Sequence, residues 1–178
     1  MRSNRLTIFI AALVAVLSLT AVAVAATVQG TDGNDTIAGT PEADVILAKK
    51  GDDTVNAGGG DDRIKGQAGS DKLNGDAGMD KIDGDRGDDT IDGGDGADRL
   101  RGGRGKDEID GGAGDDVINA RRGGQDTITC GEGNDRVRAD RRDTVASDCE
   151  NVRRPGSARE ARRERRGAGR SDARGPRS

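Results

Sequence analysis

Aspartate recurs at an interval of nine residues through the middle of the chain. The ten positions are Asp35, Asp44, Asp53, Asp62, Asp71, Asp80, Asp89, Asp98, Asp107 and Asp116. Carboxylates in a regular series suit a hard cation such as calcium, which takes roughly six to eight oxygen ligands from carboxylates and main-chain carbonyls. They suit acid–base catalysis poorly, because catalysis needs one particular pair of groups. The sequence contains no His, so no imidazole can serve as a base or a ligand. The spacing therefore predicts a repeated metal site.

The residues around each aspartate repeat with the same period. When the copies are counted from Gly30, aspartate is position 6 and position 8 is Ile, Leu or Val in all ten copies. Position 4 is Gly except at Glu42, and position 1 is Gly except at Ala48 and Ala57. Glycines permit sharp turns, and a polar–aliphatic–polar run at positions 7 to 9 is typical of a short strand with one buried face. Because one aliphatic residue per copy cannot form a core alone, the copies must stack into a solenoid.

The repeated phrase Gly-Gly-x-Gly-x-Asp-x-aliphatic-x resembles the RTX, or haemolysin-type, calcium-binding nonapeptide repeat. The copies at 93–101 and 111–119 match the phrase closely. In that family, two nonapeptides make one coil with a short strand on each side. The resemblance therefore implies an all-β fold over residues 27–119, a parallel β-roll (β-solenoid) with odd copies in one sheet and even copies in the other.

The resemblance also implies several calcium ions between successive coils. Stacking would place position-6 carboxylates about 4.8 Å apart, which is repulsive without counter-ions. The turn at 39–44 contains Pro41 and Glu42, and we expect it to close the first coil rather than to bind metal as the others do. The expected ligands are Asp35, Asp53, Asp62, Asp71, Asp80, Asp89, Asp98, Asp107 and Asp116, with turn carbonyls from Gly60, Gly69, Gly78, Gly87, Gly96, Gly105 and Gly114. Binding and folding are then one event, so the metal-free chain is expected to be largely disordered.

Other interpretations of the repeats fit less well. A chain rich in Asp and Gly and poor in aromatic residues is often disordered, but a solvated coil has no use for a strict aliphatic position. EF-hand loops need Gly at their sixth position and Glu at their twelfth, whereas a loop starting at Asp83 has Asp88 and Gly94 there. An ice-binding solenoid is disfavoured because the threonines form no regular array, as seen at Thr36, Thr54, Thr90 and Thr127.

Residues 120–152 continue the repeat irregularly, in copies of ten, nine and eight residues. The aliphatic position is kept, while arginines replace turn glycines at Arg121, Arg122, Arg141 and Arg142. Terminal repeats of solenoids are usually atypical, because they cover the end of the stack. We therefore expect this segment to be a cap.

Cys130 and Cys149 are the two cysteines of the chain and lie one coil plus one residue apart. Stacked residues in adjacent coils can meet the Cα separation of about 4.4–6.8 Å that a disulfide needs, and export would permit oxidation. We expect a Cys130–Cys149 disulfide in the last coil. A zinc site is disfavoured with two cysteines and no histidine.

Residues 1–26 are expected to be a secretory signal peptide. Arg2 and Arg5 precede an apolar run, and Ala23-Val24-Ala25 is a typical cleavage signal. A retained membrane anchor is the alternative. A cleaved leader would direct bacterial export and an extracellular location, where calcium is plentiful enough for weak sites.

Charge is divided unevenly along the chain. Residues 27–152 contain 30 acidic and 17 basic residues, which favours cations and disfavours nucleic acid as partners. Residues 153–178 contain 10 arginines and 3 acidic residues and are predicted to form a disordered basic tail. This tail is either simply solvated or contacts an anionic cell-surface polymer, a lipid or the acidic roll itself.

These features predict a secreted calcium-binding repeat protein that is not an enzyme. The aspartate spacing suits a metal array, and the chain has no room for the protease, lipase or toxin domains that accompany such repeats in larger proteins. The alternative is an extracellular adhesion or surface-interaction module in which calcium is purely structural.

Overall fold

The structure is a computed structural model that describes residues 26–155, and all regular secondary structure in this range is β-strand. The predicted signal peptide, apart from Ala26, and the predicted basic tail from residue 156 onward lie outside the described residues. Within 26–155 there is no helix of a length and apolarity that could cross a membrane.

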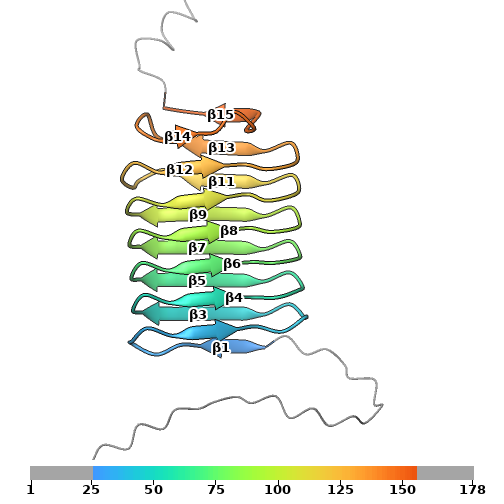
Figure 1. The fold of residues 1–178 in the computed structure, drawn as a ribbon, viewed down its shortest axis with the longest axis vertical. Coiled ribbons are helices and arrows are strands. Elements are labelled where there is room, and N and C mark those ends of the chain that lie inside the picture. Colours follow the sequence, from blue (N-terminus) through green and yellow to red (C-terminus); the bar gives the residue numbers. More distant parts are fainter. Residues whose placement is uncertain (1–25, 156–178) are drawn as a thin grey trace, which may run out of the picture.

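Fifteen strands alternate between two parallel sheets and wind the chain into a stack of coils (Figure 1). Sheet A contains β1 (Thr27–Gln29), β3 (Val45–Lys50), β5 (Arg63–Ala68), β7 (Lys81–Arg86), β9 (Arg99–Arg104), β11 (Val117–Ala120), β13 (Arg136–Ala139) and β15 (Asn151–Arg153). Sheet B contains β2 (Thr36–Ala38), β4 (Thr54–Asn56), β6 (Lys72–Asn74), β8 (Thr90–Asp92), β10 (Glu108–Asp110), β12 (Thr127–Thr129) and β14 (Thr144–Val145). The predicted β-roll is confirmed, with even copies in sheet A and odd copies in sheet B.

Strand β1 precedes the first full copy at Gly30 and adds Val28 to the row of position-8 residues. Register then places each repeat position directly on its equivalent one coil later, as in Ile46↔Ile64 and Leu73↔Ile91. The extra residue of the irregular copy 120–129 is taken up in its turn, because strand pairing continues without a slip at Ile109↔Ile128. Every repeat position therefore forms a straight column along the roll.

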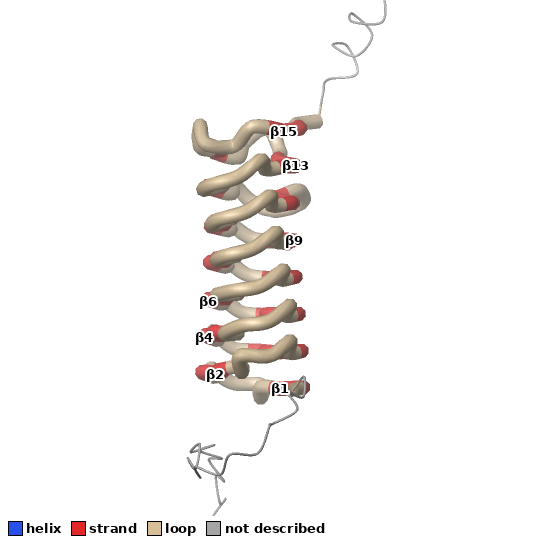
Figure 2. The backbone as a smooth tube through the Cα atoms, turned by 90° about the vertical axis from the view of Figure 1, so that its right-hand side faces the viewer, coloured by secondary structure: helices blue, strands red, loops and turns tan. Residues whose placement is uncertain are grey.

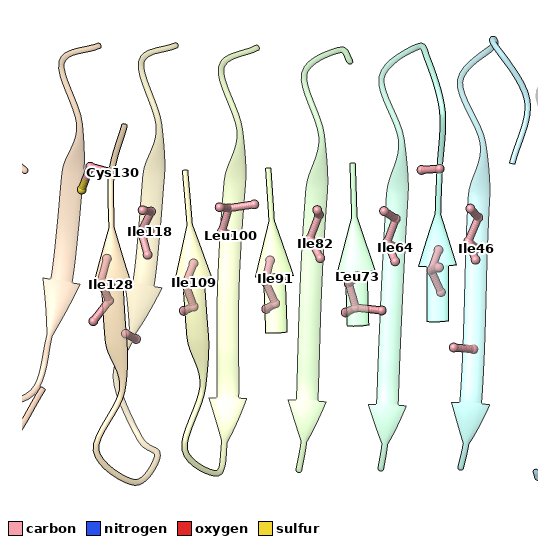
Figure 3. Packing of buried hydrophobic residues seen from close by; sticks show 14 of the residues in the cluster. Ile46, Ile64, Leu73, Ile82, Ile91, Leu100, Ile109, Ile118, Ile128 and Cys130 are labelled. Carbon is pink, nitrogen blue, oxygen red and sulfur yellow. The ribbon is translucent and has the colours of Figure 1, made fainter. Parts of the chain in front are cut away.

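The core is a double row of position-8 side chains, one row from each sheet. The two sheets lie on opposite sides of the roll (Figure 2), and their aliphatic side chains fill the space between them (Figure 3). The fully buried members include Ile46, Ile64, Ile82, Leu73 and Ile91. Burying such a side chain stabilises a fold by about 1.5–3 kcal/mol, so this narrow core supplies the apolar part of the stability in equal steps along the axis.

The expected disulfide is present. Cys130 and Cys149 are bonded, with their Cα atoms 5.2 Å apart. Cys130 is fully buried at position 1 of its copy, where the regular copies have Gly or Ala. The bond ties the turn after β12 to the segment before β15, so the last coil is held covalently to the one beneath it.

Candidate metal sites in the turns

The position-6 aspartates form two buried columns, one on each edge of the roll. From the third copy onward, ten successive copies bury this residue to 1 % exposure or less: Asp53, Asp62, Asp71, Asp80, Asp89, Asp98, Asp107, Asp116, Asp126 and Asp135. Asp44 is equally buried, whereas Asp35 in the first turn is only half-buried. The sequence places each aspartate just before a strand, and the strand register brings equivalent aspartates together coil by coil.

One oxygen of each carboxylate is used within the protein. Oδ1 of Asp71 accepts the backbone N–H of Asp53 from the preceding coil at 2.9 Å, and Oδ1 of Asp89 accepts that of Asp71 at 2.9 Å. The same bond links Asp62 to Asp80 on the other edge at 2.7 Å. Hydrogen bonds to a charged acceptor are about twice as strong as neutral ones. This ladder offsets part of the repulsion between stacked carboxylates, and the repeat pattern of the sequence does not predict it.

The other oxygen of these carboxylates has no partner in the protein. Buried Oδ2 atoms without a hydrogen bond occur at Asp53, Asp62, Asp71, Asp80, Asp89, Asp98, Asp107, Asp116, Asp126 and Asp135. Leaving a buried polar atom unsatisfied costs about 1–3 kcal/mol, and more for a charged group. Each of the two columns therefore contains five such atoms and demands positively charged ligands or protons.

Where position 1 is glycine, the unpaired Oδ2 of most central copies faces a main-chain carbonyl of the next coil across that residue. A methyl group built on Gly75 would lie 2.3 Å from Asp80 Oδ2 and 2.5 Å from the carbonyl oxygen of Gly93. A methyl group built on Gly84 would likewise lie 2.3 Å from Asp89 Oδ2 and 2.6 Å from the carbonyl oxygen of Gly102, the position-1 residue one coil later. Glycine at position 1 thus keeps open a space that is bounded by a carboxylate oxygen and a carbonyl oxygen.

Position-4 glycines supply further unpaired oxygens. Gly69 and Gly78 adopt φ angles of 137° and 140°, and a methyl group on Gly78 would lie 2.0 Å from the carbonyl oxygen of Gly60, so a side chain is excluded there. Within residues 26–155, the carbonyl oxygens at Gly60, Gly69, Gly78, Gly87, Gly96 and Gly114 accept no hydrogen bond. Gly105 differs, because its carbonyl accepts the N–H of Gly124.

The first coil satisfies its carboxylates without a cation. Oδ2 of Asp35 accepts the backbone N–H of Thr31 at 2.5 Å and its hydroxyl at 3.0 Å. Oδ2 of Asp44 accepts the backbone N–H and hydroxyl of Thr40 at 2.7 and 3.1 Å, while its Oδ1 accepts the N–H of Ala26. Asp35 was an expected ligand, and its environment thus differs from that of the other expected aspartates.

The last turns close the columns with local hydrogen bonds. Asp143 accepts the N–H of Asp126 with Oδ1 and that of Asp140 with Oδ2. Glu150 takes the place of a further aspartate, because its Oε2 accepts the N–H of Asp135 at 3.0 Å. Asp126 and Asp135 themselves keep an unpaired Oδ2, although the sequence analysis assigned them to the cap. Their position-6 spacing was the signal that could have identified them.

Burial raises the pKa of these carboxyl groups. The pKa reaches about 7 for Asp80, Asp89 and Asp116 and about 6 for Asp107, because desolvation disfavours the charged form. The hydrogen bond to the backbone N–H one coil earlier lowers the pKa in each case, and neighbouring carboxylates raise it further. A bound cation would oppose these shifts, because an adjacent positive charge favours the ionised form of the carboxyl group.

The donor set fits calcium better than zinc. In the described part of the chain, no three acidic, His or Cys side chains converge on one point, because each edge presents one position-6 carboxylate per coil. A cation between two coils would therefore be held by at most two of these carboxylates, with main-chain carbonyls completing the shell. An all-oxygen set of this kind is typical of calcium.

Stacked parallel coils with unpaired carboxylate oxygens in their turns define a metal-binding β-solenoid. The family model described as the RTX calcium-binding nonapeptide repeat matches four segments, residues 29–64, 56–91, 92–124 and 122–141. These segments together cover more than half of the chain, and the chain belongs to this family. The family binds calcium, and the resemblance seen in the sequence is confirmed. No individual curated protein matches the chain.

Proposed function

We propose that this is a secreted calcium-binding repeat protein whose β-roll folds when Ca²⁺ binds between successive coils. The observation that carries the proposal is the series of buried carboxylates with an unpaired Oδ2. An unpaired buried charge opposes folding, and the gap in polar contacts recurs once per repeat. The free energy of calcium binding would then be part of the free energy of folding.

The ligands we propose are the position-6 aspartates from Asp53 to Asp116, which leaves out those of the first coil, together with the position-4 carbonyls from Gly60 to Gly114 except that of Gly105, which already accepts a hydrogen bond. The carboxylates supply charge and the carbonyls complete the shell, so that one ion bridges two coils. Asp126 and Asp135 extend the proposed set, because they share the unpaired oxygen. Asp35 is the weakest of the expected ligands, since Thr31 already occupies its Oδ2.

The proposal includes export and the absence of catalysis. Residues 1–26 would act as the signal peptide and residues 120–152 as the cap, which the disulfide holds. Residues 153–178 would form a basic tail. The buried aspartates resemble one another in their surroundings, so no single pair is set apart for acid–base chemistry.

Calcium titration of the chain without residues 1–26 tests the proposal. Isothermal calorimetry in metal-free buffer should give several ions per chain, and far-UV circular dichroism should show β structure appearing over the same calcium range. Magnesium serves as the control, because its small size and strict octahedral geometry suit this open shell poorly. A β-sheet spectrum that excess chelator leaves unchanged would refute the coupling of folding to calcium.

A further inference from the structure

The outward-facing charges of the roll are sorted by sheet. Positions 7 and 9 point outward in every strand, because position 8 is buried between them. On sheet A these positions carry eight exposed basic residues and one acidic residue, Asp83. We call the eight the basic face: Arg63, Lys65, Lys81, Arg99, Arg101, Arg136, Arg138 and Arg153.

The basic residues stand in register along the axis. Arg63, Lys81 and Arg99 are direct partners in successive strands at position 7. Arg138 and Arg153 pair in the same way near the C-terminal end. Neighbouring strands lie about 4.8 Å apart, and positions 7 and 9 lie about 6.5–7 Å apart along a strand. Strand β11 interrupts the row with Val117 and Asn119, so the basic face consists of one group of cations on β5, β7 and β9 and a second group on β13 and β15.

The opposite face of the roll has a different character. The outward positions of sheet B hold one basic residue, Lys72, and three acidic residues, Asp92, Glu108 and Asp110. The others are mostly Thr and Asn, as in Thr54 and Asn74. The acidic total of residues 27–152 thus conceals a face of the opposite sign.

The basic face has little internal compensation. Of its eight members, Arg101 alone forms a salt bridge within residues 26–155, to Asp83 Oδ2 at 3.0 Å. Like charges placed opposite one another on adjacent strands destabilise a sheet. An uncompensated row of cations at fixed spacing indicates that an anionic partner supplies the missing charge.

We propose that the basic face of sheet A binds a linear polymer of phosphodiester-linked polyols. An extended chain aligned with the roll axis fits the basic face, because acidic residues such as Asp61, Asp76 and Asp95 bound one edge of it, while the other edge adds exposed Arg86 and Arg104 at the ends of β7 and β9. Six of the eight cations are arginines, whose planar forks match phosphate oxygens.

Other anionic partners fit the basic face less well. Single-stranded nucleic acid is bound through aromatic stacking platforms, and residues 26–155 contain no aromatic side chain. Few apolar side chains could insert into a membrane, since the exposed large apolar residues of the described range are Met79 and Val117. Polycarboxylates are themselves calcium ligands, so the calcium that the proposed function needs would compete for them.

A matched pair of triple variants tests the proposal in calcium-loaded protein. R63Q/K81Q/R99Q removes three charges from the basic face, and K72Q/K106Q/R121Q removes three exposed charges elsewhere. Binding of a synthetic glycerol-phosphate oligomer is measured by calorimetry at low salt. The first variant should weaken binding about ten-fold or more and flatten its salt dependence, while the second should change affinity about three-fold or less. Equal losses in both variants, or no binding by the parent chain, would overturn the proposal.

A single substitution should strengthen the same interaction. D83N removes the one acidic group of the basic face and frees Arg101, so oligomer affinity should rise about two- to three-fold. Tighter binding of polygalacturonate or an oligothymidylate of equal charge would also overturn the assignment. Circular dichroism in calcium confirms that each variant is folded. Calcium stoichiometry should be unchanged in all of them, which separates a failure here from a failure of the proposed function.

Discussion

The first coil and the central coils share one backbone path but treat the position-6 carboxylate in different ways. In the first coil, Thr31 and Thr40 at position 2 donate to Oδ2 of the aspartate in their own turn. In the central coils, position 2 is Gly or a residue in the left-handed region, such as Gln67 at φ 77°, and Oδ2 is left unpaired.

Under the proposed function, this difference would determine which turns depend on metal. Both regions share the position-6 carboxylate, the strand that follows it and the coil spacing. None of these shared features can therefore determine whether Oδ2 is left unpaired. The conformation and side chain of position 2 decide whether the protein itself satisfies Oδ2 or leaves it for the cation that we propose. We infer that the first coil is a metal-independent start of the roll, while every later coil up to the cap needs its ion.

Removal of calcium should produce the largest effect and should separate the two regions. Chelator should abolish most of the β-sheet signal, because the unpaired Oδ2 atoms lie in the central coils. Hydrogen exchange during stepwise chelation should show amides of residues 53–116 losing protection before those of residues 36–50. Loss of protection in the reverse order would contradict the assignment of the first coil as metal-independent.

The substitution Asp89→Asn should have opposite effects on stability with and without calcium. In calcium it removes a charged ligand and should destabilise the roll by about 2–3 kcal/mol, whereas without metal it removes an unpaired buried charge and should stabilise the fold. Asp88→Asn is the matched control, because Asp88 is exposed and its Oδ1 accepts the N–H of Lys106, which an amide oxygen can also do. Urea unfolding in calcium and in chelator measures both. The same change at Asp35 should cost about 1 kcal/mol in either condition.

Acid should partly replace calcium in the central coils. The pKa of Asp80, Asp89 and Asp116 is raised from 3.8 to about 7, so the folded state binds more protons than the unfolded state between these values. Stability of the metal-free chain should therefore rise as pH falls from about 8 to about 5, because folding then takes up protons. Circular dichroism in calcium-free buffer should show β structure increasing over that range. The calcium-loaded protein should show a much smaller dependence.

Thr40→Ala should give the smallest effect and should be confined to the first coil. The substitution removes the hydroxyl donor to Asp44 while leaving the N–H bond in place, so about 1 kcal/mol of stability should be lost. Thr36→Ala is the control, since its side chain is exposed on sheet B and a change there should be within about 0.5 kcal/mol. Thermal unfolding in calcium compares the two variants.

Much of the architecture follows from the period of the sequence. The aliphatic column follows from the period of nine, and the resemblance to the RTX repeat, with two copies per coil, then implied the two sheets and which residues stack, so the Cys130–Cys149 bond could also be predicted. The ladder from backbone N–H to Oδ1 could not, since it depends on the side-chain rotamer and on the height of one coil above the next. The hydrogen bond from the Thr31 hydroxyl to Asp35 Oδ2 could not be predicted either, because a single hydroxyl group has no periodic signal.

The charge pattern of the faces illustrates a second limit. Net charge over residues 27–152 predicts cation partners, and the buried aspartates account for that. The same sum hides the basic face, because its members are separated along the chain by nearly a full coil, as Arg63 is from Lys81. Charges of this kind become visible as a group only when the strand register is known.

The disulfide at the end of the stack also bears on how one molecule meets another. A coil that stacks on its equivalent within a chain could stack in the same way on the coil of a second molecule, and such head-to-tail contact does not close on itself. The irregular turns at 139–146 and the bond between Cys130 and Cys149 leave the upper end without a regular surface to copy. If residues 120–152 act as the proposed cap, they would keep the roll a particle of fixed length, whereas an open end would seed a growing filament.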